Sequence, residues 1–428
     1  MKKNALKFTF AVWAALASTA AYGQTTTFSY TASEKEEKFD VVAKFIGATA
    51  LQSHDFVAGA GTVVYEGVVT SIASDAFRAI GSSNTNLISI TIPASVKSLA
   101  SSAFRRSTAL TTINFDGTPT LQTIETSAFE GCSALTAFAV PASVEIISDN
   151  AFNGCSELAS FTFTGTSVLD SIGRSPFYNC PKITAITLPE SLTKTGADVF
   201  NGTNITSLVV PKNLINIGEG LTYACPITSL SVAPENPKYD SRGNCNAVIE
   251  TATNKLVAGC CTTVIPNNVT TIGTFAFAQF SGTFSLPIPE SVTAFEFGAI
   301  HMCTGLTFIS IPSGITEIDM MTFGGCISVT DVYCYANPAA LTWEGSDMAF
   351  ADSKATRFHV KSTDLAAWQT NFPDANVTFL GDLETVTPVD HLTTEPVSER
   401  WFTVDGRCIH TEPSAKGIYI HNGKKIIK

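Results

Sequence analysis

The sequence has few of the residues with which enzymes and nucleic-acid-binding proteins carry out their chemistry. Only 15% of its 428 residues are charged, and it holds six histidines and four tryptophans. Acidic residues outnumber basic ones by 37 to 26, and the resulting net charge of −11 excludes the basic surface that nucleic acid requires. The apolar run at residues 8–17 is too short to cross a bilayer, so we expect no transmembrane segment.

Motifs that mark catalytic or metal sites are also missing. The chain has no Gly-x-Ser-x-Gly, no His-Glu-x-x-His, no phosphate-binding loop and no Cys-x-x-Cys pair. The adjacent Cys260 and Cys261 lack a nearby histidine in the sequence that would serve as a base. The turn at residues 239–246 alternates oxygen-bearing side chains but lacks the closing glutamate of a calcium loop. We therefore expect a protein that is not an enzyme and has no cofactor and no metal.

The chain does contain one sequence motif that is repeated ten times. An apolar strand, often ended by proline, is followed by a second apolar pair, then by Ala-Phe and often by Gly-Cys; residues 135–141 (LTAFAVP) and 183–189 (ITAITLP) are two clear strand segments. The copies begin at residues 87, 110, 135, 158, 183, 205, 227, 283, 306 and 329. A repeat of about 22–25 residues predicts a solenoid, in which each unit buries its apolar face only against its neighbours.

The pattern inside each copy predicts which side chains point into this solenoid. Apolar residues at the first, fourth and sixth places of the strand face the core, and the second, third and fifth places face outward. The repeated Ala-Phe, as at Phe129 and Phe152, places one large side chain per coil in an interior column. We predict a β-rich solenoid with a parallel sheet on one face, short turns and 3-10 or helical pieces elsewhere, and a cap at each end.

These residues resemble the BspA-type leucine-rich repeat family of surface proteins from Bacteroidetes, whose unit reads roughly L-T-x-I-x-I-P-x-S-V-x-x-I-x-x-x-A-F-x-x-C. The resemblance covers about residues 62–350. Two short apolar runs around a polar turn predict a hairpin inserted at about residues 233–266, and such an insertion is common in this family. Family members bind host matrix proteins and other cells, so the resemblance implies a role in adhesion.

The two ends of the chain depart from the repeat. Lys2, Lys3 and Lys7, an apolar run and small residues at 21–23 are typical of an export signal that is cleaved after Gly23. Residues 398–428, which include Gly-Ile-Tyr-Ile, look like the C-terminal sorting domain of type IX secretion, which implies an extracellular or outer cell-surface location.

The predicted units are a signal peptide at 1–23, an N-terminal cap at 24–61 containing strands at 39–45 and 61–66, the repeat solenoid at 62–350, a strand–helix–strand C-terminal cap at 351–383, a linker at 384–397 and a β tail at 398–428.

Eleven cysteines in an exported protein first suggest disulfides. However, Cys132, Cys155, Cys180 and Cys326 each follow the repeat phenylalanine by three residues, which indicates a buried position in every coil. We expect buried thiols at these positions, with a disulfide between stacked neighbours such as Cys132 and Cys155 as the alternative.

The outward places of the strands carry mostly threonine and serine, with Asp331 as the only charged residue. Strand propensity alone accounts for much of this composition. Near the C-terminal end, however, aromatic residues occupy outward places on three successive strands. Exposed aromatic side chains are typical of binding surfaces. The candidate ligand-binding residues are Phe284, Phe308, Asp331, Tyr333 and Trp343. The alternative is that the C-terminal cap covers these aromatic side chains.

The sequence thus favours a secreted or surface-displayed recognition protein that binds a macromolecular partner, either a host or bacterial surface protein or a glycan. The leading hypothesis is adhesion without catalysis. Glycan capture for nutrition is the alternative, because a hydroxyl-rich face with aromatic side chains also suits sugars. A structural spacer that binds nothing is a further possibility.

Overall fold

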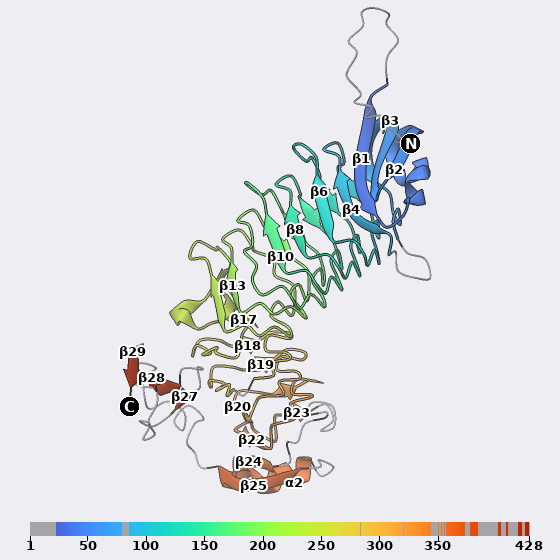
Figure 1. Cartoon of the computed structure of the whole chain (residues 1–428). Coiled ribbons are helices and arrows are strands. Elements are labelled where there is room, and N and C mark those ends of the chain that lie inside the picture. Colours follow the sequence, from blue (N-terminus) through green and yellow to red (C-terminus); the bar gives the residue numbers. More distant parts are fainter. Residues whose placement is uncertain are drawn as a thin grey trace, which may run out of the picture.

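The computed structural model describes residues 23–78, 85–282, 284–319, 321–343, 357–372 and 377–383, single residues at 350, 352 and 355, and four short strands near the C-terminus. The described chain forms an elongated rod with the N-terminal cap at one end and the C-terminal cap at the other (Figure 1). Most of the export signal expected at 1–23, and the linker expected at 384–397, lie outside the described residues.

The rod is a parallel β-solenoid of about 13 turns, as the repeat predicted. One ladder of strands forms the surface that we call the strand face. It consists of β4 (Leu87–Ile92), β6 (Thr112–Phe115), β8 (Ala137–Val140), β10 (Ser160–Phe163), β13 (Ser207–Val210), β14 (Ser229–Val232), β20 (Phe308–Ile311) and β22 (Asp331–Cys334). Its strands pair in parallel two by two, β4 with β6, β8 with β10, β13 with β14 and β20 with β22; Ile90 of β4, for example, lies opposite Ile113 of β6.

The second apolar pair of each repeat forms another parallel ladder, which we call the return ladder. Its strands are only two residues long: β5 (Ser98–Leu99), β7 (Thr123–Ile124), β9 (Ile146–Ile147), β11 (Ser171–Ile172), β12 (Lys194–Thr195), β18 (Thr271–Ile272), β19 (Ala294–Phe295), β21 (Glu317–Ile318) and β23 (Thr342–Trp343). Where both ladders are paired, a coil is hydrogen-bonded to its neighbour on two sides, and the apolar side chains of both ladders meet between them.

The repeat phenylalanines stack in one interior column. The rings of Phe104, Phe129 and Phe152 are fully buried, and successive ring centroids lie 5.2 Å apart with nearly parallel planes. This spacing is close to the separation of neighbouring strands, so one ring per coil fills the core without a gap. The predicted interior column is confirmed.

The repeat cysteines lie in a second buried column, beside the phenylalanines. All ten described cysteines are free, and each thiol of Cys132, Cys155 and Cys180 donates to the carbonyl oxygen of the repeat phenylalanine in the preceding coil at 3.1–3.2 Å. Cys326 is likewise buried. Burial raises the pKa of Cys180 to about 12, so its sulfur stays protonated and can donate. The prediction of buried thiols at these four positions is confirmed.

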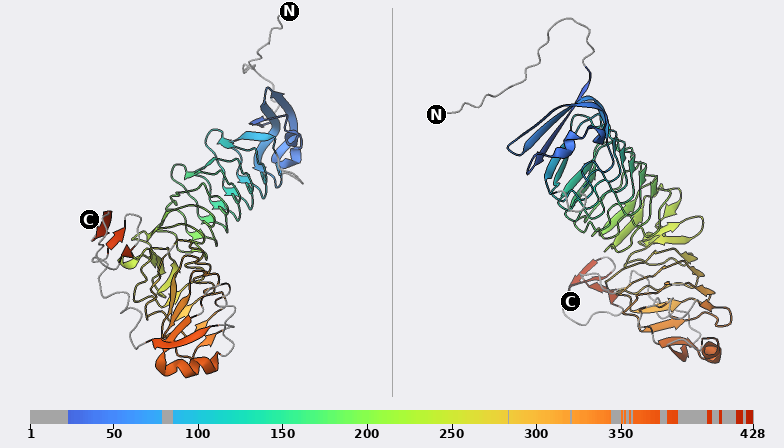
Figure 2. Two further views of the ribbon diagram at one scale, coloured as in Figure 1. Left: turned by 60° about the horizontal axis from the view of Figure 1, so that its bottom comes forward. Right: turned by 90° about the vertical axis from the view of Figure 1, so that its right-hand side faces the viewer.

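The N-terminal cap closes both ladders with a three-stranded antiparallel sheet (Figure 2). Its elements are β1 (Thr25–Ala32), the 3-10 turns η1 (Glu37–Asp40) and η2 (Val42–Lys44), β2 (Phe45–Val57) and β3 (Ala60–Ile72). β1 pairs with β4 on the strand face, and the end of β3 pairs with β5 of the return ladder. The strand predicted at residues 39–45 is wrong, because 3-10 turns there direct the buried ring of Phe39 between Phe28 and Phe45.

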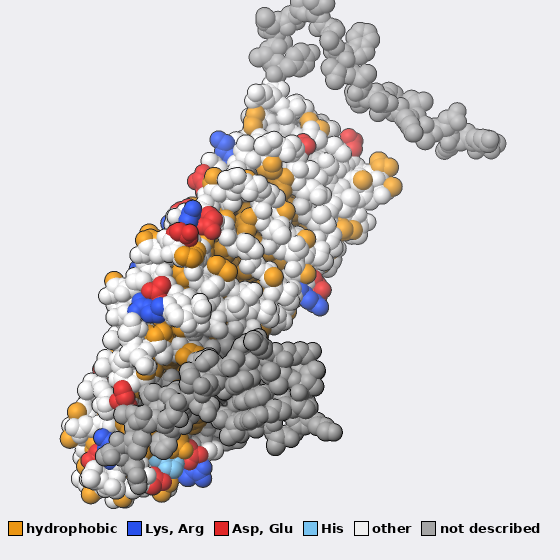
Figure 3. All heavy atoms as spheres, turned by 90° about the vertical axis from the view of Figure 1, so that its left-hand side faces the viewer, with side chains coloured by type: hydrophobic (Ala, Val, Ile, Leu, Met, Phe, Trp, Pro, Cys, Tyr) orange, Lys and Arg blue, Asp and Glu red, His pale blue; other side chains and the backbone are white. Residues whose placement is uncertain are grey.

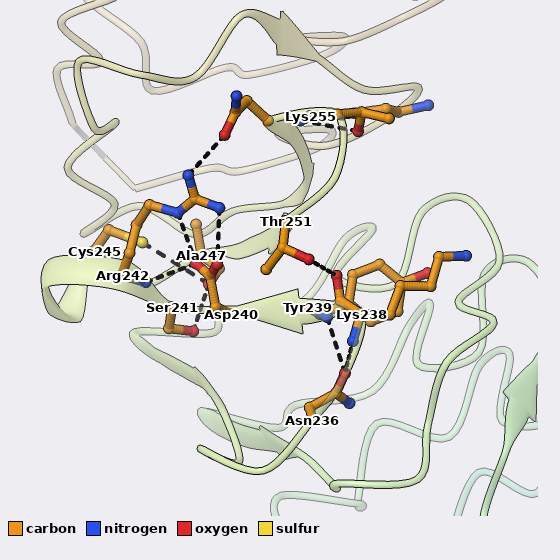
Figure 4. A network of polar contacts seen from close by, with 12 residues as sticks. Asn236, Lys238, Tyr239, Asp240, Ser241, Arg242, Cys245, Ala247, Thr251 and Lys255 are labelled. Atoms are coloured by element: carbon orange, nitrogen blue, oxygen red, sulfur yellow. Dashed lines mark hydrogen bonds and ion pairs between the residues drawn. The ribbon is translucent and has the colours of Figure 1, made fainter.

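A hairpin interrupts the repeat where the sequence predicted an insertion. It contains β15 (Tyr239–Asp240), the turn η3 (Arg242–Asn244), β16 (Val248–Glu250) and β17 (Lys255–Ala258), and β17 pairs in parallel with β18 as one rung of the return ladder. The Arg242 guanidinium holds the Asp240 carboxylate through two bonds of 2.8 Å and also donates to Asn254 (Figure 4). The positively charged guanidinium of Arg242 is therefore the partner of the acidic side chain in this turn.

The C-terminal cap adds two more strands to the strand face. β24 (Arg357–Lys361) pairs with β22 and is followed by η4 (Ser362–Asp364), α2 (Leu365–Asn371) and β25 (Thr378–Leu383), so the expected order of strand, helix and strand is present. The fully buried Trp368 anchors α2 against Phe379. Beyond the cap, four short antiparallel strands are described: β26 (Trp401–Thr403), β27 (Cys408–Ile409), β28 (Ile418–His421) and β29 (Lys424–Ile427).

Stacking of the phenylalanine column leads to a prediction for Phe129→Ala. Removing this ring leaves a cavity between two neighbouring coils, and we expect the free energy of unfolding to fall by about 3–5 kcal/mol in urea titrations followed by circular dichroism. Val168→Ala is the matched control, because Val168 is 51% exposed and should change stability by less than about 0.5 kcal/mol. Equal effects of the two substitutions would contradict the stacked core.

Close packing of the return ladder leads to a second prediction, for Gly196→Ala. A Cβ atom at Gly196 would lie 2.6 Å from backbone atoms of Gly173 and Arg174, so the coils would have to move apart and the melting temperature should fall. The control is Gly282→Ala, where no atom lies within 4 Å of the added Cβ. A melting temperature of the Gly196→Ala protein equal to that of the control would show that the coils are not held this closely.

Candidate functional site

The candidate site is the outward surface of four adjacent parallel strands, β20, β22, β24 and β25. Their register places Phe308, Asp331, Arg357 and Thr378 in one row across the sheet, and Ser310, Tyr333, His359 and Leu380 in a second row. The alternate residues, such as Val332 and Phe358, are fully buried and fix the sheet to the core. The site thus stands on a rigid support, and its side chains are set by strand alternation.

The first row is organised by an ion pair. The Nε and Nη2 atoms of Arg357 donate to the two carboxylate oxygens of Asp331, at 2.6 Å each, and Thr330 donates to the same carboxylate at 2.6 Å. The hydrogen bonds from Arg357 hold the pKa of the Asp331 carboxyl far below its usual range, although partial burial acts in the opposite direction. Asp331 therefore carries a full negative charge at neutral pH and fixes the plane of the guanidinium.

His359 connects this pair to the next strand. Its Nε2 lies 3.0 Å from an Asp331 oxygen, and its Nδ1 lies 2.9 and 3.0 Å from the oxygens of Asp382. A neutral imidazole has one N–H and can donate to only one of the two carboxylates, whereas an imidazolium donates to both. The imidazole is mostly covered, with 16% of its side chain exposed, so its orientation is fixed by these two partners.

An aromatic stack lies beside the charged row. The rings of Tyr333 and His359 lie 4.7 Å apart with an interplanar angle of 13°, and the Phe308 ring meets Tyr333 edge-on at 6.1 Å. Tyr333 is 37% exposed, so part of its ring remains available at the surface. Next to it, the hydroxyl of the buried Ser310 has no hydrogen-bond partner among the described residues. The site therefore offers an aromatic surface and an arginine held in place, two groups that are enriched at binding hot spots.

The structure brings together three of the five residues that the sequence singled out: Phe308, Asp331 and Tyr333. The expected outward position of Phe284 is wrong, because this side chain is only 8% exposed and packs against Phe280. Its coil makes an isolated bridge to Leu306 in place of a strand, so the alternation that predicted its direction does not hold there. Trp343 belongs to β23 of the return ladder, where it pairs with Ile318, and not to the strands of the site.

Sequence reasoning missed Arg357, His359 and Asp382 as members of the site. The segment from Arg357 was predicted as a strand of the C-terminal cap, and the alternation of Arg357 and His359 with the apolar Phe358 and Val360 was a signal that both would face outward. The alternative that the cap covers the aromatic residues is correct in part: β24 extends the sheet sideways, and His359 covers one face of the Tyr333 ring.

Other chemistry that the sequence raised finds no support in the described part of the chain. Cys260 is buried, the pKa of the half-buried Cys261 is raised by burial, and a protonated thiol is a poor nucleophile. No described cluster of three or more His, Cys, Asp and Glu side chains is placed to bind a metal ion. Among the described residues, no helix is both long and apolar enough to cross a bilayer.

The geometry defines a class of protein, a capped leucine-rich repeat solenoid. A family model described as "BspA type leucine rich repeat region" matches residues 70–169, 122–242 and 258–371, about two thirds of the chain. The chain belongs to this family, and the family resemblance inferred from the repeat is confirmed. The comparison with curated proteins gave no match.

Two solved structures with the same fold come from other bacteria. The crystal structure of a leucine rich cell surface protein from Faecalibacterium prausnitzii is similar over 81% of this chain and 89% of its own, with 23% identity and a TM-score of 0.58. A leucine-rich repeat protein from Eubacterium ventriosum is similar over 64% and 74% of the two chains, with 17% identity and a TM-score of 0.52. At these identities the likeness establishes the fold alone.

The ion pair of the site leads to a prediction for Asp331→Asn. Because the pKa of Asp331 is lowered by folding, the charged carboxylate stabilises the fold above its unfolded pKa of about 4, and this contribution declines as the pH falls below that value. We expect the variant to melt a few degrees below the wild type at pH 7, with the difference shrinking toward pH 3.

The control for this measurement is Asp116→Asn, since Asp116 is exposed and its side chain makes no hydrogen bond or ion pair with the described residues. Its melting difference should be close to zero at both pH values. A difference for Asp331→Asn that is the same at pH 7 and pH 3 would contradict the role of the charge.

Proposed function

We propose that this protein is a non-catalytic recognition protein that acts at the cell surface or outside the cell. It binds a partner protein through the outward face of β20, β22, β24 and β25. The observation that carries the proposal is the aromatic and guanidinium surface formed by Tyr333, His359 and Arg357, held by Asp331 and Asp382 on a rigid sheet. Preorganised aromatic and arginine groups lose little conformational entropy on binding, so they suit a protein partner.

Family membership supports this role, because leucine-rich repeat solenoids present extended surfaces for binding. The Faecalibacterium prausnitzii protein is described as a cell surface protein. We propose the same location for this chain, reached through the export signal at residues 1–23 and the sorting-type tail at 398–428. A search for the cleaved N-terminus and an intact mass of the secreted protein test both segments.

The proposal predicts that the double variant Phe308→Ser, Tyr333→Ser loses binding. The probes are a panel of purified extracellular-matrix proteins, immobilised for surface plasmon resonance, and a glycan array. We expect at least one matrix protein to bind, and we expect the double variant to bind it at least about tenfold more weakly, because aromatic anchors dominate interface energies. Circular dichroism melting establishes that the variant is folded.

The matched control is Val209→Ser, which removes an exposed apolar side chain (58% exposed) from the strand face far from the site. This variant should bind as the wild type does. Equal binding by the double variant and the wild type would refute this site. A glycan hit that depends on Tyr333, with no matrix protein bound, would instead establish the glycan-binding alternative.

A further inference from the structure

The strand face opens between β10 and the next coil. The repeat predicted a strand at residues 183–188, but none forms there, and in this fully described part of the chain no backbone hydrogen bond joins residues 184–188 to β10 or to β13. The opening is a groove of about 810 Å³. Residues 161–167 form one wall and residues 185–191 form the other. The predicted continuous sheet is therefore wrong at this coil.

The spacing of the core changes at the same coil. At the inward fourth place of the strand, β8 and β10 carry Phe138 and Phe161. The Phe161 ring packs between those of Phe152 and Phe177, at centroid distances of 5.1 and 4.7 Å. The repeat rings of Phe152 and Phe177 lie 6.1 Å apart and those of Phe177 and Phe200 6.2 Å apart, against 5.2 Å in the preceding coils. The opening therefore lies where the coils become more widely spaced in the core.

The return ladder stays closed behind the same coils. β11 and β12 pair in register, and the Gly196 amide donates to the Ile172 carbonyl at 2.8 Å. Gly173 and Gly196 allow this approach, because a Cβ atom at either would lie within 2.6 Å of backbone atoms in the preceding coil. Two coils that touch at the back and separate in front form a wedge, and the axis of the rod changes direction in this region, between β10 and β18 (Figure 1).

The walls of the wedge present free backbone groups. The amides of Ser160 and Thr164 donate toward β8, to Thr136 and Val140. Because successive peptide groups of a parallel strand point to opposite sides, the peptide groups of Phe161 and Phe163 face the groove. By the same alternation, the peptide groups of Ala185 and Thr187 face the groove from the other wall. Backbone groups at an open sheet edge bind an additional strand.

The side chains around the groove restrict what can enter it. The half-buried Phe163 and the buried Ile186 and Leu188 supply apolar surface, and the residues between 161 and 189 that line the groove include no charged side chain. Glu190 and Lys212, of opposite sign, lie together at one end. Such walls complement a neutral segment with apolar side chains at alternate positions and not a charged helix. The volume lies within the usual range of about 300–1,000 Å³ for binding pockets.

We propose that this groove binds an extended, uncharged segment of a partner polypeptide, which inserts as an extra strand between β10 and residues 184–188. Its backbone would pair with the peptide groups of Phe161 and Phe163 on one side and of Ala185 and Thr187 on the other. This site lies on different coils from the aromatic site near the C-terminal cap and does not depend on it. Figure 3 shows small mixed groups of acidic and basic side chains over one face of the rod, with no large area of one sign that would favour a highly charged partner.

The test uses the full chain and a fluorescent, acetylated peptide with the sequence LTAFAVP, which copies the strand segment at 135–141 and therefore supplies one additional rung. A control peptide carries proline at its third and fifth positions and cannot pair along its length. We expect the first peptide to bind in fluorescence anisotropy and the second not to bind. Residue-resolved amide hydrogen exchange should show new protection at Phe161, Phe163, Ala185 and Thr187 when the first peptide is present.

Two variants at one position isolate the contribution of a backbone N–H group to peptide binding. Thr187→Pro removes a donor that faces the groove, whereas Thr187→Ala removes only the exposed side chain and keeps the donor. We expect Thr187→Pro to weaken peptide binding at least about tenfold and Thr187→Ala to leave it within about twofold. Thermal melting of both variants verifies that each is folded, since Thr187 takes part in no strand of the free protein.

Three outcomes would overturn the proposal. The first is that these four amides are already protected in the free protein as strongly as those of β8, which would mean that the groove is closed by pairing. The second is that no protection or anisotropy change develops at about 1 mM peptide, the weak end of specific affinities. The third is that the two Thr187 variants bind the peptide equally.

Discussion

Each coil of this solenoid is buried by the coils on either side of it, and the clearest instance is the ring of Phe129, which lies 5.2 Å from both Phe104 and Phe152. A single coil has a hydrophobic face that it cannot cover itself, so its stability comes from its neighbours. The two ladders of backbone hydrogen bonds set the distance between coils, and the rings fill that distance. The same dependence explains the caps, because the first and last coils would otherwise expose both core and strand edges.

This nearest-neighbour packing is the reason that the fold could be predicted from the sequence. Residues repeated at a fixed spacing occupy equivalent positions in successive coils, so the interior phenylalanines and the buried cysteines followed from their place in the repeat. The failures occur where a local turn or a change in coil spacing overrides the pattern. Residues 183–188 have the strand pattern but form no strand, and the distance between repeat rings rises from 5.2 to 6.1 Å at the same coil, a change that no alternation rule predicts.

The candidate site was found in part for the same reason. Phe308, Asp331 and Tyr333 lie at outward places of regular strands, where alternation predicts direction reliably. Arg357 and His359 lie beyond the last recognisable repeat, so their alignment with Asp331 and Tyr333 needed the register of β24. The contact between His359 and Asp382 depends on the irregular register between β24 and β25 after His359, which no sequence pattern marks.

The regular coils and the irregular ones have different capacities for recognition. A strand face that repeats threonine and serine at every coil offers the same surface at each step, so a partner bound there could shift by one coil with little change in free energy. Its low charge also gives little long-range attraction to orient a partner. A unique binding position therefore needs a place where the repeat is broken. The described part of the chain has several such breaks, and two of them present a candidate surface: the cap that sets Arg357 and His359 beside Tyr333, and the wedge that leaves β10 with an open edge. Both arise from the coil-to-coil packing, the first where a cap must end it and the second where the spacing of the coils increases.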